Sequence, residues 1–278
     1  MKNEMNIFEA ERLRHKILND IADENEEELV FQYVCQIIDK SLSLKYKEAE
    51  IYECVQGILN GLQKANDKSA DNHTLVKLVE FNQQIEEVVT TYLEPEQVAD
   101  LFTRDKYHCD GSTSGTAIIN FMDKEMSSSN PVLKKLKSKR AKITFLILTD
   151  AALNDNEQLR ENARKKIETN RYWNGYARVL VVFLGHEKYK GTAVALANGN
   201  EDNVIAIEDA QAVILSPALV EATLTMTDGT HVNSTDERTF TQIIEEEHER
   251  HAEGEKSAEE QVDDDLLKTF EKLIQGLQ

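Results

Sequence analysis

Apolar residues are concentrated between about positions 30 and 226, where two kinds of spacing alternate along the chain. Runs of mostly β-branched and aromatic residues predict buried strands, and apolar residues at three-and-four spacing predict helices between them. The strands are expected at 30–38, 75–81, 84–93, 142–149, 178–185 and 203–208. The helices are expected at 46–66, 115–127, 132–139, 155–171, 187–198 and 209–215.

This alternation predicts an α/β fold with a doubly wound, mostly parallel sheet of six strands. The two strand-like runs at 75–81 and 84–93 are separated by Asn82 and Gln83, so we expect a short hairpin that places one antiparallel strand at the edge. Ligands of such sheets bind beyond the carboxyl ends of the strands. The residues that follow each strand are therefore the first candidates for a functional site.

The two ends of the chain are more polar than its centre. The 278 residues carry a net charge of −19, and residues 229–278 alone hold 14 acidic and 5 basic side chains. We therefore expect an N-terminal helical extension at 1–29, an α/β domain at 30–226, and an acidic linker with an amphipathic C-terminal helix at 227–278. Apolar residues recur at helical spacing from Val262 to Leu277, so this last helix is expected to dock on its own domain or to contact a partner.

The charge and the hydropathy exclude several classes of protein. Binding to nucleic acid or to an anionic membrane begins with lysine and arginine, which this acidic chain does not concentrate in large numbers. The longest apolar runs fall far short of the ~20 residues that cross a bilayer. The first residues lack the apolar core of a secretory signal, and three scattered cysteines fit a reducing compartment, so a cytoplasmic location is expected.

Oxygen-bearing side chains follow two of the predicted strands. Asp39, Ser41 and Ser43 come directly after the first strand, and Asp150 follows the fourth. A hydroxyl-rich loop at 110–117 opens a predicted helix between them. If the first loop is extended, its alternate side chains point the same way and their oxygens converge. Carboxylates and hydroxyls without histidine or cysteine predict a hard divalent cation, with Mg²⁺ favoured and Mn²⁺ or Ca²⁺ also accommodated.

These segments together resemble the von Willebrand factor A family. The resemblance is carried by 36-QIIDKSLSL-44, 110-DGSTSGTAI-118 and 145-FLILTDA-151 and covers about residues 30–226. It implies a metal-ion-dependent adhesion site (MIDAS) in which Asp39, Ser41 and Ser43 form the first segment. The second segment of the family has a threonine three residues before a helical glycine, which here gives Ser112, with Thr113 as the alternative; the third segment gives Asp150.

The chain departs from the family pattern at three positions near the implied ligands. Leu42 and Leu44 stand where the family has glycine and methionine, and Ala151 stands where it has glycine. None of these changes removes a ligand oxygen, but a leucine at position 42 would be costly if the loop needed a positive φ there. The nearest subgroup is the intracellular bacterial type found with tellurium-resistance and other stress systems.

The resemblance implies a module that is not an enzyme. Its divalent ion would hold an open coordination position, which an Asp or Glu of a partner protein fills. The first alternative is a Mg²⁺-dependent phosphoryl-transfer enzyme, although the chain lacks a phosphate loop of the G-x-x-x-x-G-K-[ST] form. The second alternative is a scaffold whose metal site is inactive.

Overall fold

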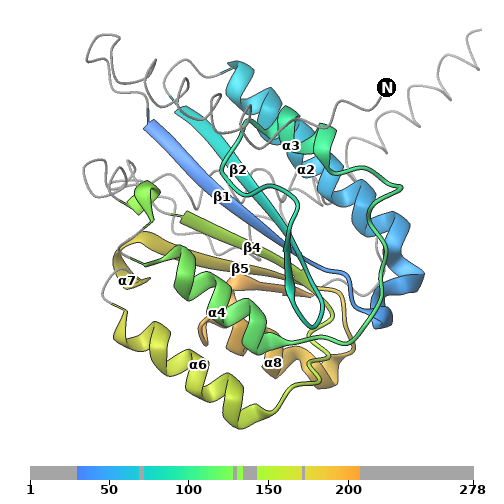
Figure 1. Ribbon diagram of the computed structural model, residues 1–278, viewed down its shortest axis with the longest axis vertical. Coiled ribbons are helices and arrows are strands. Elements are labelled where there is room, and N and C mark those ends of the chain that lie inside the picture. The colour runs from blue at the N-terminus through green and yellow to red at the C-terminus, as the bar shows by residue number, and fades with distance from the viewer. Residues whose placement is uncertain (1–29, 69–71, 128–129, 134–142, 171–172, 207–278) are drawn as a thin grey trace, which may run out of the picture.

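A six-stranded mixed sheet forms the centre of the molecule in the computed structural model, which describes residues 30–68, 72–127, 130–133, 143–170 and 173–206 (Figure 1). The strand order is β3-β2-β1-β4-β5-β6. All neighbouring strands are parallel except β2 and β3, which form the antiparallel hairpin at one edge. The predicted fold class is confirmed. The strands are β1 (Val30–Asp39), β2 (Asn72–Phe81), β3 (Ile85–Glu87), β4 (Ile143–Thr149), β5 (Ala177–Phe183) and β6 (Val204–Ala206).

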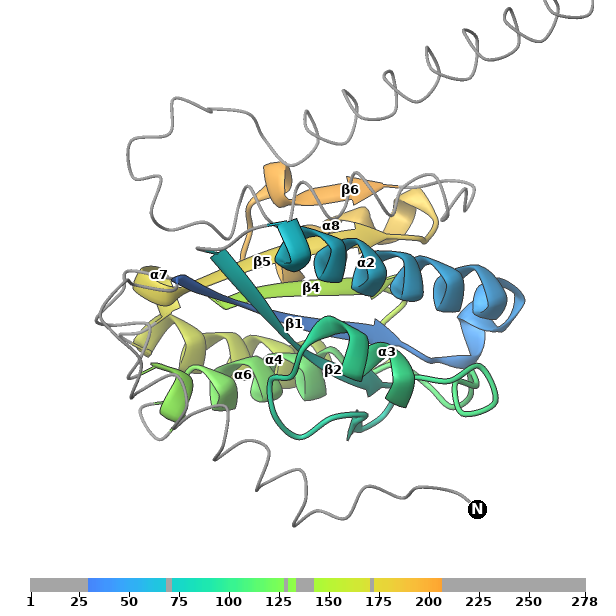
Figure 2. The ribbon, with the colours of Figure 1, turned by 90° about the horizontal axis from the view of Figure 1, so that it is seen from above.

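Helices cover both faces of the sheet, which explains the almost continuous apolar sequences of the central strands. Figure 2 shows α2 (Glu48–Lys68) on one side of β1 and β4, and α4 (Gly115–Glu125) and α6 (Glu157–Thr169) on the other. Alternate residues of β1 divide between the two cores: Val34 and Ile38 pack with α2, and Cys35 and Ile37 pack with α4.

Smaller helices complete the two layers. The side of the sheet that α2 covers also packs against α3 (Pro95–Leu101), and the side of α4 also packs against α8 (Lys190–Leu196). A short helix, α7 (Trp173–Tyr176), precedes β5 and places the indole of Trp173 against Phe145, with the ring centroids 5.8 Å apart. Three 3₁₀ helices, η1 (Leu42–Lys47), η2 (Glu187–Tyr189) and η3 (Glu201–Asn203), lie in the connections.

The structure corrects the prediction for residues 84–93. Only Ile85–Glu87 forms a strand, and the chain then leaves the sheet edge except for one isolated bridge between Val76 and Leu93. The helix α3 that follows was not expected from the apolar spacing. The sequence does contain a signal for the start of this helix, because Pro95 is its first residue. Glu94 and Gln97 form a capping box, in which each side chain accepts a backbone N–H.

Other predicted elements fall wholly or partly outside the described residues. These are the helix at 209–215, most of the helix at 132–139, the N-terminal extension at 1–29, the end of the α/β domain at 226, and the linker and helix at 227–278. Those predictions therefore stay predictions. Within the described ranges, no helix is both long and apolar enough to cross a membrane.

Candidate functional site at the carboxyl edge of the sheet

The carboxyl ends of the parallel strands bring the predicted segments to one edge. In the register of the sheet, Ile38 lies beside Leu148 and Thr149 beside Phe183, so β1, β4 and β5 end together. The loop before α4 reaches the same edge through two backbone hydrogen bonds. The N–H of Asp110 donates to the carbonyl of Lys40 at 2.7 Å, and the N–H of Leu42 donates to the carbonyl of Gly111 at 3.1 Å.

Asp39 lies at the centre of this edge and is fully buried. One carboxylate oxygen accepts the backbone N–H of Ser41 at 2.8 Å, and the other accepts the hydroxyl of Thr149 at 2.6 Å. The hydroxyl of Tyr107 donates to the backbone carbonyl of Asp39 at 2.9 Å. The carboxylate is therefore held in one orientation by β4 and by the start of the loop that follows β1.

Burial raises the pKa of the Asp39 carboxyl to about 7, the hydrogen bonds from Thr149 and Ser41 lower it in part, and the nearby charge of Asp150 raises it again. Asp150 is itself buried, and one of its carboxylate oxygens accepts the N–H of Ala152 at 3.0 Å. Among the residues that the structure describes, neither carboxylate forms an ion pair with a basic side chain. The edge therefore holds two close acidic groups that a bound cation would stabilise.

Ser41 and Ser43 supply two hydroxyls that converge beside Asp39. Their oxygens lie 3.0 Å apart, with Ser41 buried and Ser43 exposed. The loop is not extended through Ser43, as the alternate spacing predicted. Ser41 has extended backbone angles, but it precedes η1, and Leu44 donates its N–H to the Ser41 carbonyl at 3.0 Å. The 3₁₀ turn brings the two hydroxyls together in place of the expected side-by-side alternation.

The second segment presents its candidate ligands differently. The Ser112 hydroxyl is half-buried and accepts the side-chain amide of Gln83 from the β2–β3 hairpin at 2.9 Å. Thr113 is buried, and its backbone exchanges hydrogen bonds with Asn154, whose side chain accepts the Thr113 N–H at 3.0 Å. The loop backbone thus lies against the first segment through Asp110 and Gly111, while the Ser112 hydroxyl contacts Gln83 of the hairpin.

The family departures cause less strain than the sequence suggested. Leu42 lies in η1 and is not among the described residues with positive φ, so this loop has no need of glycine there. Ala151 does have a φ of 53°, in the left-handed region that glycine occupies readily. Gly111, with a φ of 70°, keeps the glycine that its backbone requires.

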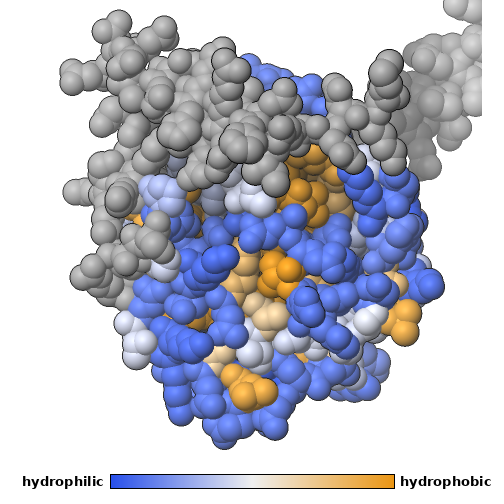
Figure 3. Space-filling model, viewed as in Figure 1, coloured by the Kyte–Doolittle hydropathy of each residue, from blue (hydrophilic) through white to orange (hydrophobic). Residues whose placement is uncertain are grey.

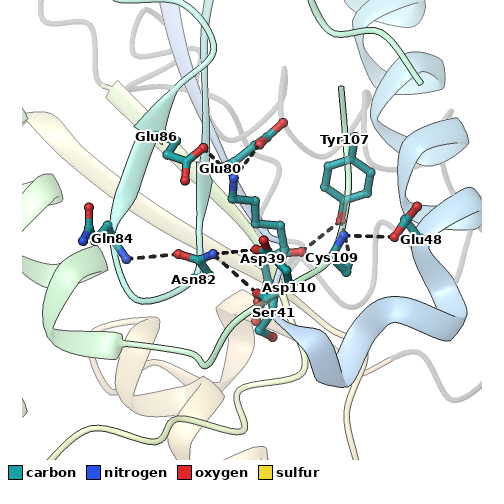
Figure 4. A network of polar contacts seen from close by, with 11 residues as sticks. Asp39, Ser41, Glu48, Glu80, Asn82, Gln84, Glu86, Tyr107, Cys109 and Asp110 are labelled. Carbon is teal, nitrogen blue, oxygen red and sulfur yellow. Dashed lines mark hydrogen bonds and ion pairs between the residues drawn. The ribbon is translucent and has the colours of Figure 1, made fainter. Parts of the chain in front are cut away.

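Several residues that hold the site were missed by sequence reasoning. Figure 4 shows that Asn82 joins the loop through Asp110, with its amide 2.9 Å from the carboxylate, and that Glu48 accepts the N–H of Cys109 at 2.9 Å. Thr149, which orients Asp39, was also missed. The sequence did contain a signal for it, because a hydroxyl at a strand end directly before a carboxylate is positioned to contact the end of the neighbouring strand. The contacts of Glu48 and Asn82 cross 61 and 28 residues, and no local pattern encodes them.

Lys40 is adjacent to Asp39 in sequence, but its ammonium group points to a different carboxylate pair. Its Nζ lies 3.3 Å from a Glu80 oxygen and 2.5 Å from a Glu86 oxygen (Figure 4). These two partners hold the pKa of Lys40 above its ordinary value, against the opposing effect of burial. The basic charge nearest in sequence is thus used to tie the β2–β3 hairpin to the end of β1.

The donor set fits a hard divalent cation on chemical grounds. Two buried carboxylates without a basic partner lie beside two converging hydroxyls, and all of these groups are oxygen donors. Ser41 and Ser43 would hold the ion, with Ser112 or Thr113 completing the set and Asp39 and Asp150 neutralising its charge. A cation bound there would supply a Lewis-acidic centre for an outside carboxylate.

Comparisons with known proteins give a fold and no family. No family model matches the chain, and no curated protein matches it. Among solved structures, it resembles the pilus adhesin SpaC of Lactobacillus rhamnosus GG with a TM-score of 0.53 and 10% identity, over 73% of this chain and 31% of that one. The PilB minor pilin of Streptococcus sanguinis has a TM-score of 0.52 and 11% identity, over 74% and 63%.

A third similar structure contains a metal. Proximal thread matrix protein 1 of the mussel byssus, with a zinc-occupied MIDAS motif, has a TM-score of 0.50 and 16% identity, over 72% of this chain and 49% of that one. The chain thus spans less than two thirds of the length of each of these proteins. At these identities the likeness establishes architecture alone, and the architecture is of the von Willebrand factor A type.

Proposed function

We propose that this chain is a protein-interaction module that binds a carboxylate of a partner protein through a divalent cation at the carboxyl edge of its sheet. The observation that carries the proposal is the buried carboxylate of Asp39, which pairs with no described basic side chain, beside the paired hydroxyls of Ser41 and Ser43. The adhesion and matrix proteins that share the fold support an interaction role over an enzymatic one. Mg²⁺ is the favoured ion, because hydroxyl and carboxylate ligands in small number suit it.

The polarity of the ligands explains why an outside carboxylate would be recruited. Hydroxyl groups are neutral, so a dication held mainly by Ser41, Ser43 and Ser112 keeps positive charge that it can share with another acidic group. Asp39 and Asp150 lie behind the hydroxyls, where burial restricts their access to solvent. An Asp or Glu side chain is the protein ligand that best satisfies such a centre.

The finer expectations belong to the same proposal. A role in a bacterial stress-response system, similar to tellurium resistance, follows from the resemblance stated for the sequence, and a cytoplasmic location follows from the scattered cysteines and the polar first residues. The genes that neighbour the coding sequence test the first, and fractionation of the native cells tests the second.

Metal binding is tested by titrating Mg²⁺ and Mn²⁺ calorimetrically into the full chain after chelation. We expect a single site in the unmodified protein and its loss in Asp39→Asn, Ser41→Ala and Asp150→Asn. The matched controls are Asp202→Asn, on exposed η3, and Ser114→Ala, which removes the cap of α4 and the hydrogen bond from Ser114 to Asp155. A folded wild type that binds neither ion would overturn the metal site and favour the scaffold alternative.

Carboxylate recognition is tested separately on a peptide array that pairs Asp and Glu sequences with their Asn and Gln counterparts. We expect Mg²⁺-dependent retention of the acidic peptides and none of the amide peptides. Equal retention of both sets would contradict the proposal. A phosphate ester included in the same buffer detects turnover, which would favour the phosphoryl-transfer alternative.

A further inference from the structure

The first turn after the candidate metal loop exposes apolar side chains to solvent. Leu42 is 57% exposed and Tyr46 is 75% exposed, and both lie on η1. The other large apolar side chain exposed in the described residues is Leu159, at 55%, on α6. Figure 3 shows that apolar surface on the face drawn is divided into patches by hydrophilic surface.

Two lysines alternate with these apolar residues. Lys45 is exposed and Lys47 is buried, and neither forms an ion pair with an acidic residue within the described ranges. The Nζ of Lys47 donates to the carbonyl of Leu184 at 3.4 Å and lies 5.6 Å from the centroid of the Tyr46 ring. In a chain with a net charge of −19, the exposed Lys45, which has no acidic partner within the described ranges, lies beside the candidate metal loop and suits an acidic ligand.

This surface, which we call the η1 face, consists of Leu42, Lys45 and Tyr46. It is continuous with the candidate metal site, because Leu42 lies between Ser41 and Ser43 in the chain. A ligand that fits both would carry carboxylates directly followed by apolar side chains. The carboxylates would meet the cation and Lys45, and the apolar side chains would cover Leu42 and Tyr46.

The chain itself contains such a segment outside the described residues. Residues 263–267 read DDDLL, with three carboxylates followed by two leucines. The chain between β6 and this segment is long enough for the segment to reach the η1 face. Ala206, at the end of β6, pairs with Phe183, which pairs with Thr149, so the chain leaves the described part at the same edge as the site. Three strand spacings amount to roughly 15 Å, which about five extended residues span, and 56 residues lie between Ala206 and Asp263.

We propose that residues 263–267 of the same chain dock on the η1 face, with an aspartate at the metal site and Leu266 and Leu267 against Leu42 and Tyr46. The aspartate contact rests on the proposed metal-dependent function; the apolar and lysine contacts do not. Docking within one chain acts as competition, because an outside carboxylate must displace the aspartate. An acidic partner protein then competes for the site with an internal ligand that also carries carboxylates.

Site-specific photo-crosslinking in the full chain tests this contact. Tyr46 is replaced by p-benzoylphenylalanine, an aromatic residue that an exposed position accommodates, and Leu159 is replaced in the same way as the matched control. We expect the probe at position 46 to crosslink to a peptide containing Leu266 and Leu267, in a band of monomer mass. The combined change Asp263→Asn, Asp264→Asn and Asp265→Asn is expected to lower the yield about tenfold, as the loss of a tenfold binding factor would.

Three results would overturn the proposal: a crosslink in a band of dimer mass, a crosslink to a different segment, or a yield no higher than that of the position-159 control.

Repeating the crosslinking with a chelator present separates this proposal from the proposed function. If calorimetry shows a metal site but chelation leaves the crosslink unchanged, the aspartate is not at the ion and that part of the contact is wrong. If calorimetry shows no metal and the crosslink to 263–267 persists, docking on the η1 face stands and the metal-dependent function fails.

Discussion

Asp39 combines two properties that rarely coexist in a side chain without a ligand. It is fully buried, yet no described basic residue pairs with it, and its hydrogen bonds come from one backbone N–H and one hydroxyl. Burying a charge without a counter-charge is costly, so the group gains protons at a higher pH than a solvated aspartate does. The protein therefore carries an electrostatic cost at neutral pH that a bound cation would remove.

The stability of the metal-free chain should fall as the pH rises from about 4 to about 7. Asp39 has a pKa of about 7 in the folded state and 3.8 as its ordinary value, so the folded state binds the extra proton in that window. The loss amounts to roughly 4 kcal/mol at most. Urea unfolding at pH 4 and pH 8 measures it, and Asp39→Asn should flatten the dependence. An equal slope in the variant would show that other groups dominate.

The sequence predicted Asp39, Ser41, Ser43 and Asp150 at the correct edge because strand ends can be located from apolar runs. It did not predict the orientation of these side chains. Ser43 reaches Ser41 through a 3₁₀ turn, and Thr149 orients Asp39 across a gap of 110 residues. Local spacing identifies which strand a residue follows, whereas its partners depend on the register between strands that are distant in sequence.

At the scale of elements, the end of β5 supports the loop that follows β4. The N–H of Leu184 donates to the carbonyl of Thr149 at 2.9 Å. A Cβ at Gly185 would lie 2.2 Å from the carbonyl oxygen of Asp150, so only glycine permits this approach. The position of the Asp150 carboxylate thus depends on a residue of the neighbouring strand connection.

Gly185→Ala should therefore destabilise the fold by about 1–3 kcal/mol through overpacking and weaken Mn²⁺ binding by displacing Asp150. Gly191→Ala is the matched control, because a Cβ there meets no atom within 4 Å and the residue lies in α8. The control should be neutral or up to about 1 kcal/mol more stable, since alanine favours a helix. Thermal unfolding and calorimetry provide both readouts, and equal behaviour of the two variants would argue against the contact.

The hairpin shows where element prediction failed and why. Residues 84–93 combine apolar and β-branched types that favour a strand, but pairing ends after Glu87. An edge strand has only one neighbour, so local propensity is weakly reinforced there. The strand ends at the residues that form ion pairs. The ammonium groups of Lys40 and Lys77 bind Glu86 and Glu87 at the end of β3.

At the scale of the whole molecule, the sheet separates two hydrophobic cores. The core on the α4 side contains a buried ion pair, in which the Nζ of Lys77 lies 2.8 Å from Glu125 and 3.1 Å from Glu87. These contacts join β2, β3 and α4. This network lies away from the carboxyl edge in the register of β1 and β2, where Lys77 is paired with Cys35. Stability and metal binding should therefore be separable.

Lys77→Met should lower the free energy of unfolding by about 3–5 kcal/mol, because it leaves Glu125 buried without a counter-charge. The double variant Lys77→Met with Glu125→Met should recover most of that loss. Lys124→Met is the control, since Lys124 is exposed on the same helix and should change little. Urea denaturation measures stability, and Mn²⁺ affinity should remain unchanged in every variant that folds. A loss of affinity in Lys77→Met would contradict the separation.

The predicted architecture of the sheet was accurate at this scale because alternation of strands and helices is a property of long stretches of sequence. The sheet has the six strands and the antiparallel edge strand that were predicted, although β3 is much shorter than expected. Boundaries were less accurate, as α2 begins at Glu48 after a 3₁₀ turn that a simple apolar spacing does not distinguish from a helix.

The left-handed backbone of Ala151 has a consequence for how proteins of this kind are recognised. An alanine in that conformation costs roughly 1 kcal/mol relative to glycine, which a fold of ordinary stability tolerates. A pattern that requires glycine after the third-segment aspartate would reject this chain, although its backbone takes the same path that glycine would take. Divergent relatives would be found more reliably by searching for backbone angles and convergent oxygens than by searching for the letters of a motif.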